Sequence, residues 1–186
     1  MTRFEEALLS IARFLEEAGI PYMVIGGVAN LFWGVPRTTL DVDVTVWVED
    51  RDISPLIHRL AGAFRLLPED PAEFVRETRV LPMETPQGFR TDLIFGALPF
   101  EEAAIRRARV MPVAGQPVRV CTPEDLIVSK IVSDRPRDRE DVAGITQRQG
   151  PALDRKYLDP IIEGLAVEMG RPDLIEFYRR CVGEMA

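Results

Sequence analysis

Three aspartates of the chain stand where they can bind cations. Asp41 and Asp43 lie one residue apart at the head of a β-branched run, so in a strand both side chains project from the same face. Asp92 is embedded in a second apolar run, FRTDLIF. A carboxylate in such a run is costly unless it is paired or bound to a metal. The pattern predicts either a shared cation site or ion pairs, with Arg90 or Arg37 as the partner of Asp92.

Two further features could supply the anion-binding half of such a site. Gly26 and Gly27 follow a short apolar run and precede a helix-like segment. A strand, two glycines and a helix start aim backbone N–H groups at a bound anion, although a plain glycine turn is the alternative. Lys130 lies between Ile127 and Ile131 on an apolar helix side and needs an anionic partner.

Three carboxylates facing a glycine turn suit two-metal phosphoryl transfer. In that chemistry acidic side chains hold two divalent ions about 3.5–4 Å apart, and the ions stabilise the attacking and leaving oxygens. Ligation by oxygen favours magnesium or manganese over zinc. The protein contributes mainly positioning and charge, because the transition state needs little covalent help.

The elements that must position these residues follow from hydrophobic period, caps and breakers. Helices are expected at 4–15, 28–33, 53–60, 99–107, from 123 up to the stop at Arg135-Pro136, and at 137–145, 155–169 and 172–182. Strands are expected at 22–25, 41–48, 64–67, 74–81 and 89–95, with a hairpin over 108–120. Thr2 and Thr122 are predicted helix caps, and Asp50 or Asp52 is expected to cap the helix at 53–60. The fold class is α+β: a mixed sheet with flanking helices over residues 1–121 and a C-terminal helical segment over 122–186, packed on the core.

Composition narrows the function classes. The 186 residues carry a net charge of −7, which disfavours a general nucleic-acid binder, although arginines cluster locally between 105 and 119. No apolar run approaches the roughly 18 residues that span a bilayer, so we expect a cytoplasmic protein with no membrane partner. Cys121 and Cys181 are expected to be free thiols, and His58, the sole histidine, an exposed residue.

Two segments, in this order, resemble the signature of the DNA polymerase beta-like nucleotidyltransferase superfamily. The first is Gly26-Gly27-(x)9-Arg37-x-Thr39-x-Asp41-x-Asp43. The second is Pro123-Glu124-Asp125-Leu126-(x)3-Lys130-(x)4-Arg135-(x)2-Asp138-(x)2-Asp141. Within the superfamily, the chain is most similar to minimal nucleotidyltransferases and bacterial abortive-infection nucleotidyltransferase toxins.

The resemblance implies roles for the matched positions of the first segment and for Asp92. Gly26 and Gly27 would cradle the triphosphate of a nucleotide through their backbone. Asp41, Asp43 and Asp92 would be catalytic and would bind Mg²⁺ or Mn²⁺. Asp92 would also help to deprotonate the acceptor hydroxyl.

The resemblance likewise implies that Arg37, Thr39 and Lys130 bind the nucleotide. Asp138 and Asp141 match the second segment, and they either pack the helices or order the arginine of that segment. Two departures are visible. The glycine turn lacks the serine common in the superfamily, and Arg148 is the nearest candidate for the lysine that the toxins carry after the second acid.

The sequence therefore predicts a metal-dependent nucleotidyltransferase that moves a nucleoside monophosphate from an NTP to an acceptor hydroxyl. The acceptor is left open among an RNA end such as tRNA, a protein and a small molecule. A toxin of a toxin–antitoxin or abortive-infection system, with a cognate antitoxin protein as partner, fits the resemblance. The alternatives are a non-catalytic nucleotide-binding or partner-binding module of the same fold, or a domain whose three aspartates are salt-bridged.

Overall fold

The computed structural model describes residues 1–184, which form two compact units. The sheet unit holds Met1–Val28 and Thr38–Cys121, and the helical unit holds Ala29–Arg37 and the described residues from Thr122 onward. The predicted division into residues 1–121 and 122–186 differs from these units by the segment Ala29–Arg37.

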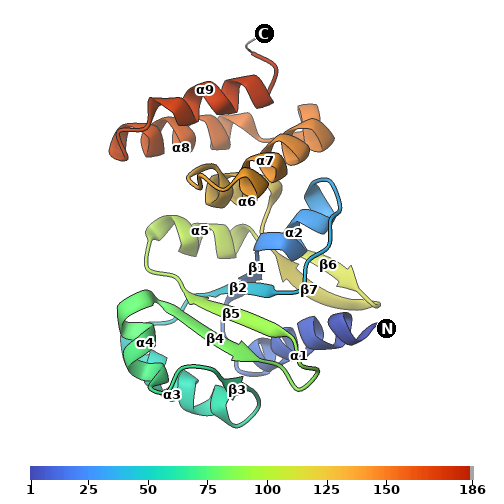
Figure 1. The fold of residues 1–186 in the computed structure, drawn as a ribbon, viewed down its shortest axis with the longest axis vertical. Helices are drawn as coiled ribbons and strands as arrows, with labels where there is room; N and C mark the ends of the chain where they lie inside the picture. Colours follow the sequence, from blue (N-terminus) through green and yellow to red (C-terminus); the bar gives the residue numbers. More distant parts are fainter. Residues whose placement is uncertain (185–186) are drawn as a thin grey trace. The chain divides into compact units, whose positions relative to one another are not determined.

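The sheet unit is built on a mixed sheet of seven strands in the order β3-β4-β5-β2-β1-β7-β6 (Figure 1). The strands are β1 (Tyr22–Val24), β2 (Val42–Val46), β3 (Arg65–Leu66), β4 (Val80–Glu84), β5 (Arg90–Phe95), β6 (Arg109–Val113) and β7 (Gln116–Val120). The pairs β2–β5 and β1–β7 are parallel, and the other neighbours are antiparallel. The predicted α+β class with a mixed sheet is confirmed.

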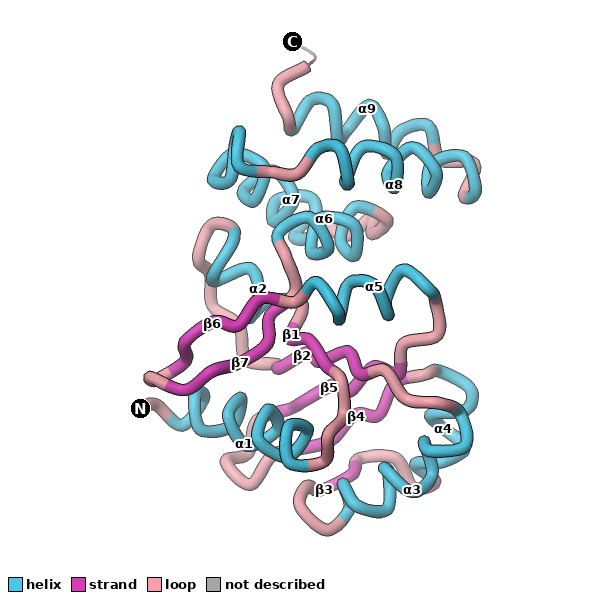
Figure 2. The backbone as a smooth tube through the Cα atoms, turned by 180° about the vertical axis from the view of Figure 1, so that it is seen from behind, coloured by secondary structure: helices cyan, strands magenta, loops and turns pink. Residues whose placement is uncertain are grey.

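Helices cover both faces of this sheet. They are α1 (Arg3–Glu17), α3 (Asp50–Ala61), α4 (Pro71–Thr78) and α5 (Pro99–Arg107). Helix α1 lies on one side of the sheet and α5 on the other, as both views show (Figures 1 and 2). The three valines at alternate positions of β2, Val42, Val44 and Val46, are fully buried in the core. The opposite face of β2 is the one that carries Asp43.

Local signals account for several boundaries. Helix α1 begins with a capping box in which the Thr2 side chain accepts from the Glu5 backbone N–H and the Glu5 side chain accepts from the Thr2 backbone. The β6–β7 hairpin turns at Ala114 and Gly115, both at positive φ, which is the backbone geometry that a tight hairpin needs. Both predictions are confirmed.

The strand predicted at 74–81 is wrong, because its first half is helix α4. Asp70 accepts a hydrogen bond from the Glu73 backbone N–H, and Pro71 occupies the first helical turn. Arg79, in the left-handed conformation at φ 59°, ends the helix, and strand β4 begins at the next residue. The cap and the proline outweigh the strand propensity of Phe74 and Val75.

The start of α3 also differs from expectation. Glu49 occupies the N-cap and its side chain makes no capping bond, whereas Asp50 and Asp52 lie within the first turn. There their charges still complement the helix dipole. The predicted cap is therefore wrong.

The helical unit contains α6 (Pro123–Ile131), α7 (Pro136–Gln149), a 3₁₀ turn (Gly150–Ala152), α8 (Arg155–Glu168) and α9 (Pro172–Cys181). The four α-helices are labelled in Figure 2. Helix α6 starts as predicted: the Thr122 hydroxyl oxygen accepts from the Asp125 backbone N–H. Helix α2 (Gly26–Trp33) begins in the sheet unit, and its last residues belong to the helical unit. There the side chains of Arg148 and Gln149 donate to the carbonyls of Gly34 and Trp33.

The isolated residues behave as expected. Cys121 is buried, Cys181 is half-buried, and neither forms a disulfide. His58 is exposed on α3. Over residues 1–184, no helix combines the length and the apolar character needed to cross a membrane.

Candidate active site

The sheet register places two of the predicted aspartates side by side. Asp43 on β2 and Asp92 on β5 are directly paired positions of neighbouring parallel strands. Paired positions of adjacent strands project to the same face, with the strands about 4.8 Å apart. Asp41 lies two residues before Asp43, just outside β2, and is exposed. The three aspartates therefore lie at or near the N-terminal ends of two neighbouring parallel strands, with Asp43 and Asp92 on the same face of the sheet.

The start of α2 lies against Asp43. Gly26, the first residue of α2, has φ 63°, and a Cβ built there would lie 2.0 Å from Asp43 Oδ2 and 2.8 Å from its Cγ. Only glycine fits this position, because a side chain would be strained at that φ and would displace the carboxylate. Gly26 and Gly27 are thus the first turn of the helix rather than a turn that precedes it.

Asp92 has a protein partner in this structure. The Arg90 guanidinium donates to both carboxylate oxygens, with Nε–Oδ1 at 3.1 Å and Nη2–Oδ2 at 3.4 Å. Arg90 is two residues earlier on β5, on the same face. Of the two partners that the sequence suggested, Arg90 is the one observed.

The donor set suits a hard divalent cation, since all three side chains offer carboxylate oxygens. The pairing of Asp43 with Asp92 also fits an ion shared between two strands. Within residues 1–184, however, no three His, Cys, Asp or Glu side chains form a group that could hold a metal. The strand register still places Asp43 and Asp92 at neighbouring positions, and the Asp92 side chain would have to leave Arg90 to bind an ion there.

Lys130 and Arg37 lie in the helical unit and share one buried carboxylate. Lys130 Nζ is 2.8 Å from Asp138 Oδ1 and 2.8 Å from Asp141 Oδ2. Arg37 donates through Nε at 2.8 Å and Nη2 at 2.7 Å to the two oxygens of Asp141. Arg135 and Ser133 add contacts to Asp138. We call these residues the Lys130 cluster.

The centre of the Lys130 cluster, formed by Lys130, Asp138 and Asp141, is largely buried and paired. The side chains of Lys130 and Asp141 are 7% and 4% exposed. Burial raises the pKa of Asp141, but hydrogen bonds from Arg37 and Lys130 outweigh it and hold that pKa below its usual value. Burial likewise raises the pKa of Asp138, and bonds from Lys130 and Ser133 lower it overall. Both carboxylates are therefore ionised at neutral pH and serve as the partners that Lys130 requires.

Thr39 and the arginines between residues 105 and 119 make local contacts within the sheet unit. The Thr39 hydroxyl donates to the Asp41 carbonyl at 3.3 Å, which stabilises the loop before β2. In the expected basic stretch, Arg106 pairs with Glu102 and Arg119 pairs with Glu16. These ion pairs reduce the positive charge that the surface can offer.

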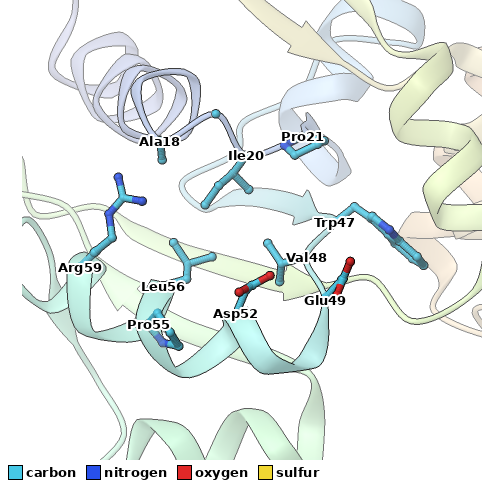
Figure 3. A pocket seen from close by; sticks show the side chains of 11 residues that line it. Ala18, Ile20, Pro21, Trp47, Val48, Glu49, Asp52, Pro55, Leu56 and Arg59 are labelled. Atoms are coloured by element: carbon cyan, nitrogen blue, oxygen red, sulfur yellow. The ribbon is translucent and has the colours of Figure 1, made fainter.

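A large hollow of the sheet unit lies away from the carboxylates. It has a volume of about 470 Å³ and is lined by the end of α1, the residues that follow it and the first turns of α3 (Figure 3). Trp47 forms one wall and Arg59 stands at the other end (Figure 3). Trp47 follows the last residue of β2, whereas Asp43 is the second residue of that strand. The hollow therefore opens at the opposite end of β2 and contains no predicted site residue.

Sequence reasoning did not identify Asp141 as the shared partner of Arg37 and Lys130, and it left the partner of Asp92 open. A signal was present for the first: a lysine on an apolar helix side, followed by two acids three residues apart in the next helix. No local signal shows which of two arginines reaches Asp92, because that depends on the tertiary fold.

We expect Gly26→Ala to destabilise the protein more than Gly19→Ala, by about 1–3 kcal/mol. Both glycines have φ above 60°, but a Cβ at Gly19 meets nothing within 4 Å. The difference between the two variants thus isolates the conflict with Asp43. Urea unfolding measures it, and most of the excess should vanish in an Asp43→Ala background. Equal losses for the two alanine variants would show that the close approach to Asp43 is absent.

We expect Lys130→Met to lower the free energy of unfolding by about 3–5 kcal/mol, because it leaves two buried carboxylates without their shared cation. Lys156→Met is the matched control, since Lys156 is exposed and is the only other lysine. Chemical denaturation of both variants measures the difference. A phosphate ligand without a structural role would instead leave stability unchanged and weaken nucleotide binding.

The lowered pKa values of Asp138 and Asp141 predict a loss of stability in acid. Their contribution is present above the unfolded pKa of about 3.9 and is lost as pH falls through the lower folded values. The free energy of unfolding should fall less between pH 5 and pH 3 in Asp138→Asn/Asp141→Asn than in the unchanged protein. Glu140→Gln/Glu168→Gln, which removes two exposed carboxylates of the same unit, should keep the original pH dependence. Identical slopes for all three proteins would contradict this.

Solved structures of other proteins share the fold. An antigenic nucleotidyltransferase-like protein from Paracoccidioides brasiliensis is 19% identical with a TM-score of 0.57, over 95% of this chain and 92% of that chain. ANT(2″)-Ia in complex with adenylyl-2″-tobramycin is 17% identical with a TM-score of 0.59, over 90% and 99%. The lincosamide antibiotic adenylyltransferase LnuA is 13% identical with a TM-score of 0.51, over 76% and 96%.

No curated relative matches the chain. A family model described as "Nucleotidyltransferase of unknown function (DUF6036)" matches residues 4–163, which covers all seven strands and most of the helical unit. The superfamily expected from the two sequence segments is thus confirmed. The chain belongs to this DUF6036 family of nucleotidyltransferases.

Proposed function

We propose that the protein transfers a nucleoside monophosphate from an NTP to an acceptor hydroxyl, at the carboxylates of the sheet unit. The observation that carries the proposal is the direct pairing of Asp43 with Asp92, with Asp43 seated against the first residue of α2. Membership of a nucleotidyltransferase family supports it. Two proteins of similar fold are named as an antibiotic adenylyltransferase and as a complex with an adenylylated antibiotic, which is transfer of this kind.

In this proposal the aspartates bind the metal ions, and the start of α2 binds the phosphates. Asp41, Asp43 and Asp92 would hold Mg²⁺ or Mn²⁺, which would neutralise phosphate charge and acidify the acceptor hydroxyl when bound. The first backbone N–H groups of α2, at Gly26 and Gly27, have no partner within the helix and favour an anion such as a phosphate. Asp92 is then placed to accept the proton of the acceptor hydroxyl.

The predicted nucleotide contacts of Arg37, Thr39 and Lys130 carry different support. The Arg37 side chain is 23% exposed beside Asp141, so part of its guanidinium remains accessible to a phosphate. Lys130 is enclosed between two carboxylates, which favours a structural role over a phosphate contact. Thr39 would act through the loop that carries Asp41.

The acceptor and the biological setting belong to the proposal as well. An RNA end, a protein hydroxyl and a small molecule are each compatible with the carboxylate site. A toxin controlled by a cognate antitoxin is one setting that fits the two sequence segments. A non-catalytic nucleotide-binding or partner-binding module is the second candidate, and the Arg90–Asp92 ion pair favours it.

We expect Asp43→Asn to reduce nucleotidyl transfer by about 100-fold or more, because the amide removes one of the two paired carboxylate charges. The thermal midpoint should stay the same or rise, since repulsion between neighbouring carboxylates is relieved. Labelled NTPs with Mg²⁺, incubated with total RNA, lysate protein and candidate small molecules, provide the assay. Glu69→Gln, at an exposed acid of the same unit, is the control and should retain full activity.

The catalytic proposal fails if calorimetry at millimolar concentration detects no binding of any Mg-NTP. Binding of nucleotide without transfer to any acceptor would instead favour the non-catalytic module. A large fall in the thermal midpoint of Asp43→Asn would indicate a structural aspartate.

A further inference from the structure

We propose that Arg90 is a positioning residue that holds the Asp92 carboxylate, and that a divalent cation must displace Arg90 to bind there. The inference rests on the proposed function, because it concerns the regulation of the same carboxylates. Asp92 is the position paired with Asp43 in the sheet, so a cation shared by the two strands would need the carboxylate that Arg90 holds.

The contact between Arg90 and Asp92 occupies both carboxylate oxygens. Its two branches join Nε to Oδ1 and Nη2 to Oδ2, at 3.1 and 3.4 Å. This two-pronged geometry fixes the carboxylate plane and places a positive charge beside the oxygens that a cation would use. A metal ion and the guanidinium therefore compete for the same side chain.

The same contact is weak enough to be exchanged. The Arg90 side chain is 54% exposed and that of Asp92 is 25% exposed. Ion pairs with this much solvent contact contribute little, because water screens them and long side chains lose entropy when they are held. The guanidinium can move into solvent without leaving a buried charge behind. Arg90 thus offsets the charge of Asp92, and a divalent cation that binds the carboxylate more strongly can replace it.

A second ion pair on the same sheet provides an internal standard. Arg65 on β3 donates to both oxygens of Glu84 on β4, at 3.2 and 2.7 Å. Glu84 is the directly paired neighbour of Arg90 across β4 and β5. The Arg65–Glu84 pair has the same chemistry and lies close by, but it contains no predicted metal ligand. Removal of Arg65 therefore reports the general electrostatic effect of losing one nearby positive charge.

The test is Mn²⁺ binding to the full chain without nucleotide, measured by calorimetry and by the electron paramagnetic resonance of free Mn²⁺. We expect Arg90→Met to bind Mn²⁺ about two- to five-fold more tightly than the unchanged protein, the range that a weak ion pair allows. Arg65→Met should show a clearly smaller change. Arg90→Lys, which keeps the charge but not the two-pronged contact, should be intermediate.

A double-mutant cycle separates the contact from the field of the charge. In an Asp92→Asn background, Arg90→Met should give no more than the small change of Arg65→Met. If Arg90→Met equals Arg65→Met in the unchanged background, or if its effect persists in the Asp92→Asn background, the inference is overturned. When Mn²⁺ binding is lost in Asp43→Asn but equal in Arg90→Met and Arg65→Met, the proposed function stands and only the inference fails. Absence of Mn²⁺ binding in every protein overturns both.

Discussion

Repulsion between two carboxylates at paired positions of neighbouring strands is the constraint on which the sheet unit depends. Like charges at paired positions of adjacent strands repel each other, and water screens the repulsion only in part where the side chains are partly exposed. The protein tolerates Asp43 beside Asp92 through two separate contacts. Asp43 lies against the start of α2, where the helix dipole favours negative charge, and Asp92 pairs with Arg90. Each contact also prepares part of the proposed site, since one supplies backbone N–H groups and the other can be exchanged for a metal.

The close approach of Asp43 to α2 fixes the identity of Gly26. A left-handed φ and a Cβ position already filled by a carboxylate oxygen exclude every other residue without rearrangement. Two independent physical reasons therefore require glycine at position 26, its φ and the contact with Asp43. At position 19 only the φ favours glycine. The distinction matters because a glycine next to a strand end is often no more than a turn residue.

Much of the fold could be predicted from the sequence because its signals are local. The alternation of Asp41 and Asp43 with valines identified the face of β2, and Thr122 with Pro123 identified the start of α6. Helix α4 was missed because an aspartate cap and a proline over Asp70 and Pro71 outweighed strand-forming residues. The local sequence does not indicate which strands pair with one another. The register of β2 against β5 is decided by tertiary contacts, and so it could not be predicted from the sequence.

The partners of charged residues show the same limit. The need of Lys130 for an anion could be inferred, but the sequence did not identify the two carboxylates of α7 that pair with it. Arg37 pairs with Asp141, 104 residues away in the chain, and no spacing rule pointed to that partner. Spacing along the sequence limits such pairs only within one helix or one strand. Between elements, only the fold decides.

The carboxylates of the Lys130 cluster and those of the sheet unit differ in how deeply they are buried and in how many donors hold them. In the Lys130 cluster the carboxylates are buried and each is held by two or more donors, so loss of Lys130, which they share, would remove a positive charge from both in the interior. In the sheet unit Asp41 is exposed, and Asp92 is partly exposed and held by a single arginine that can move into solvent. Charges that can change partners at little cost are the ones that can bind and release a substrate or an ion. On this ground the sheet carboxylates, rather than the more tightly bonded acids of α7, are the candidates for the chemistry.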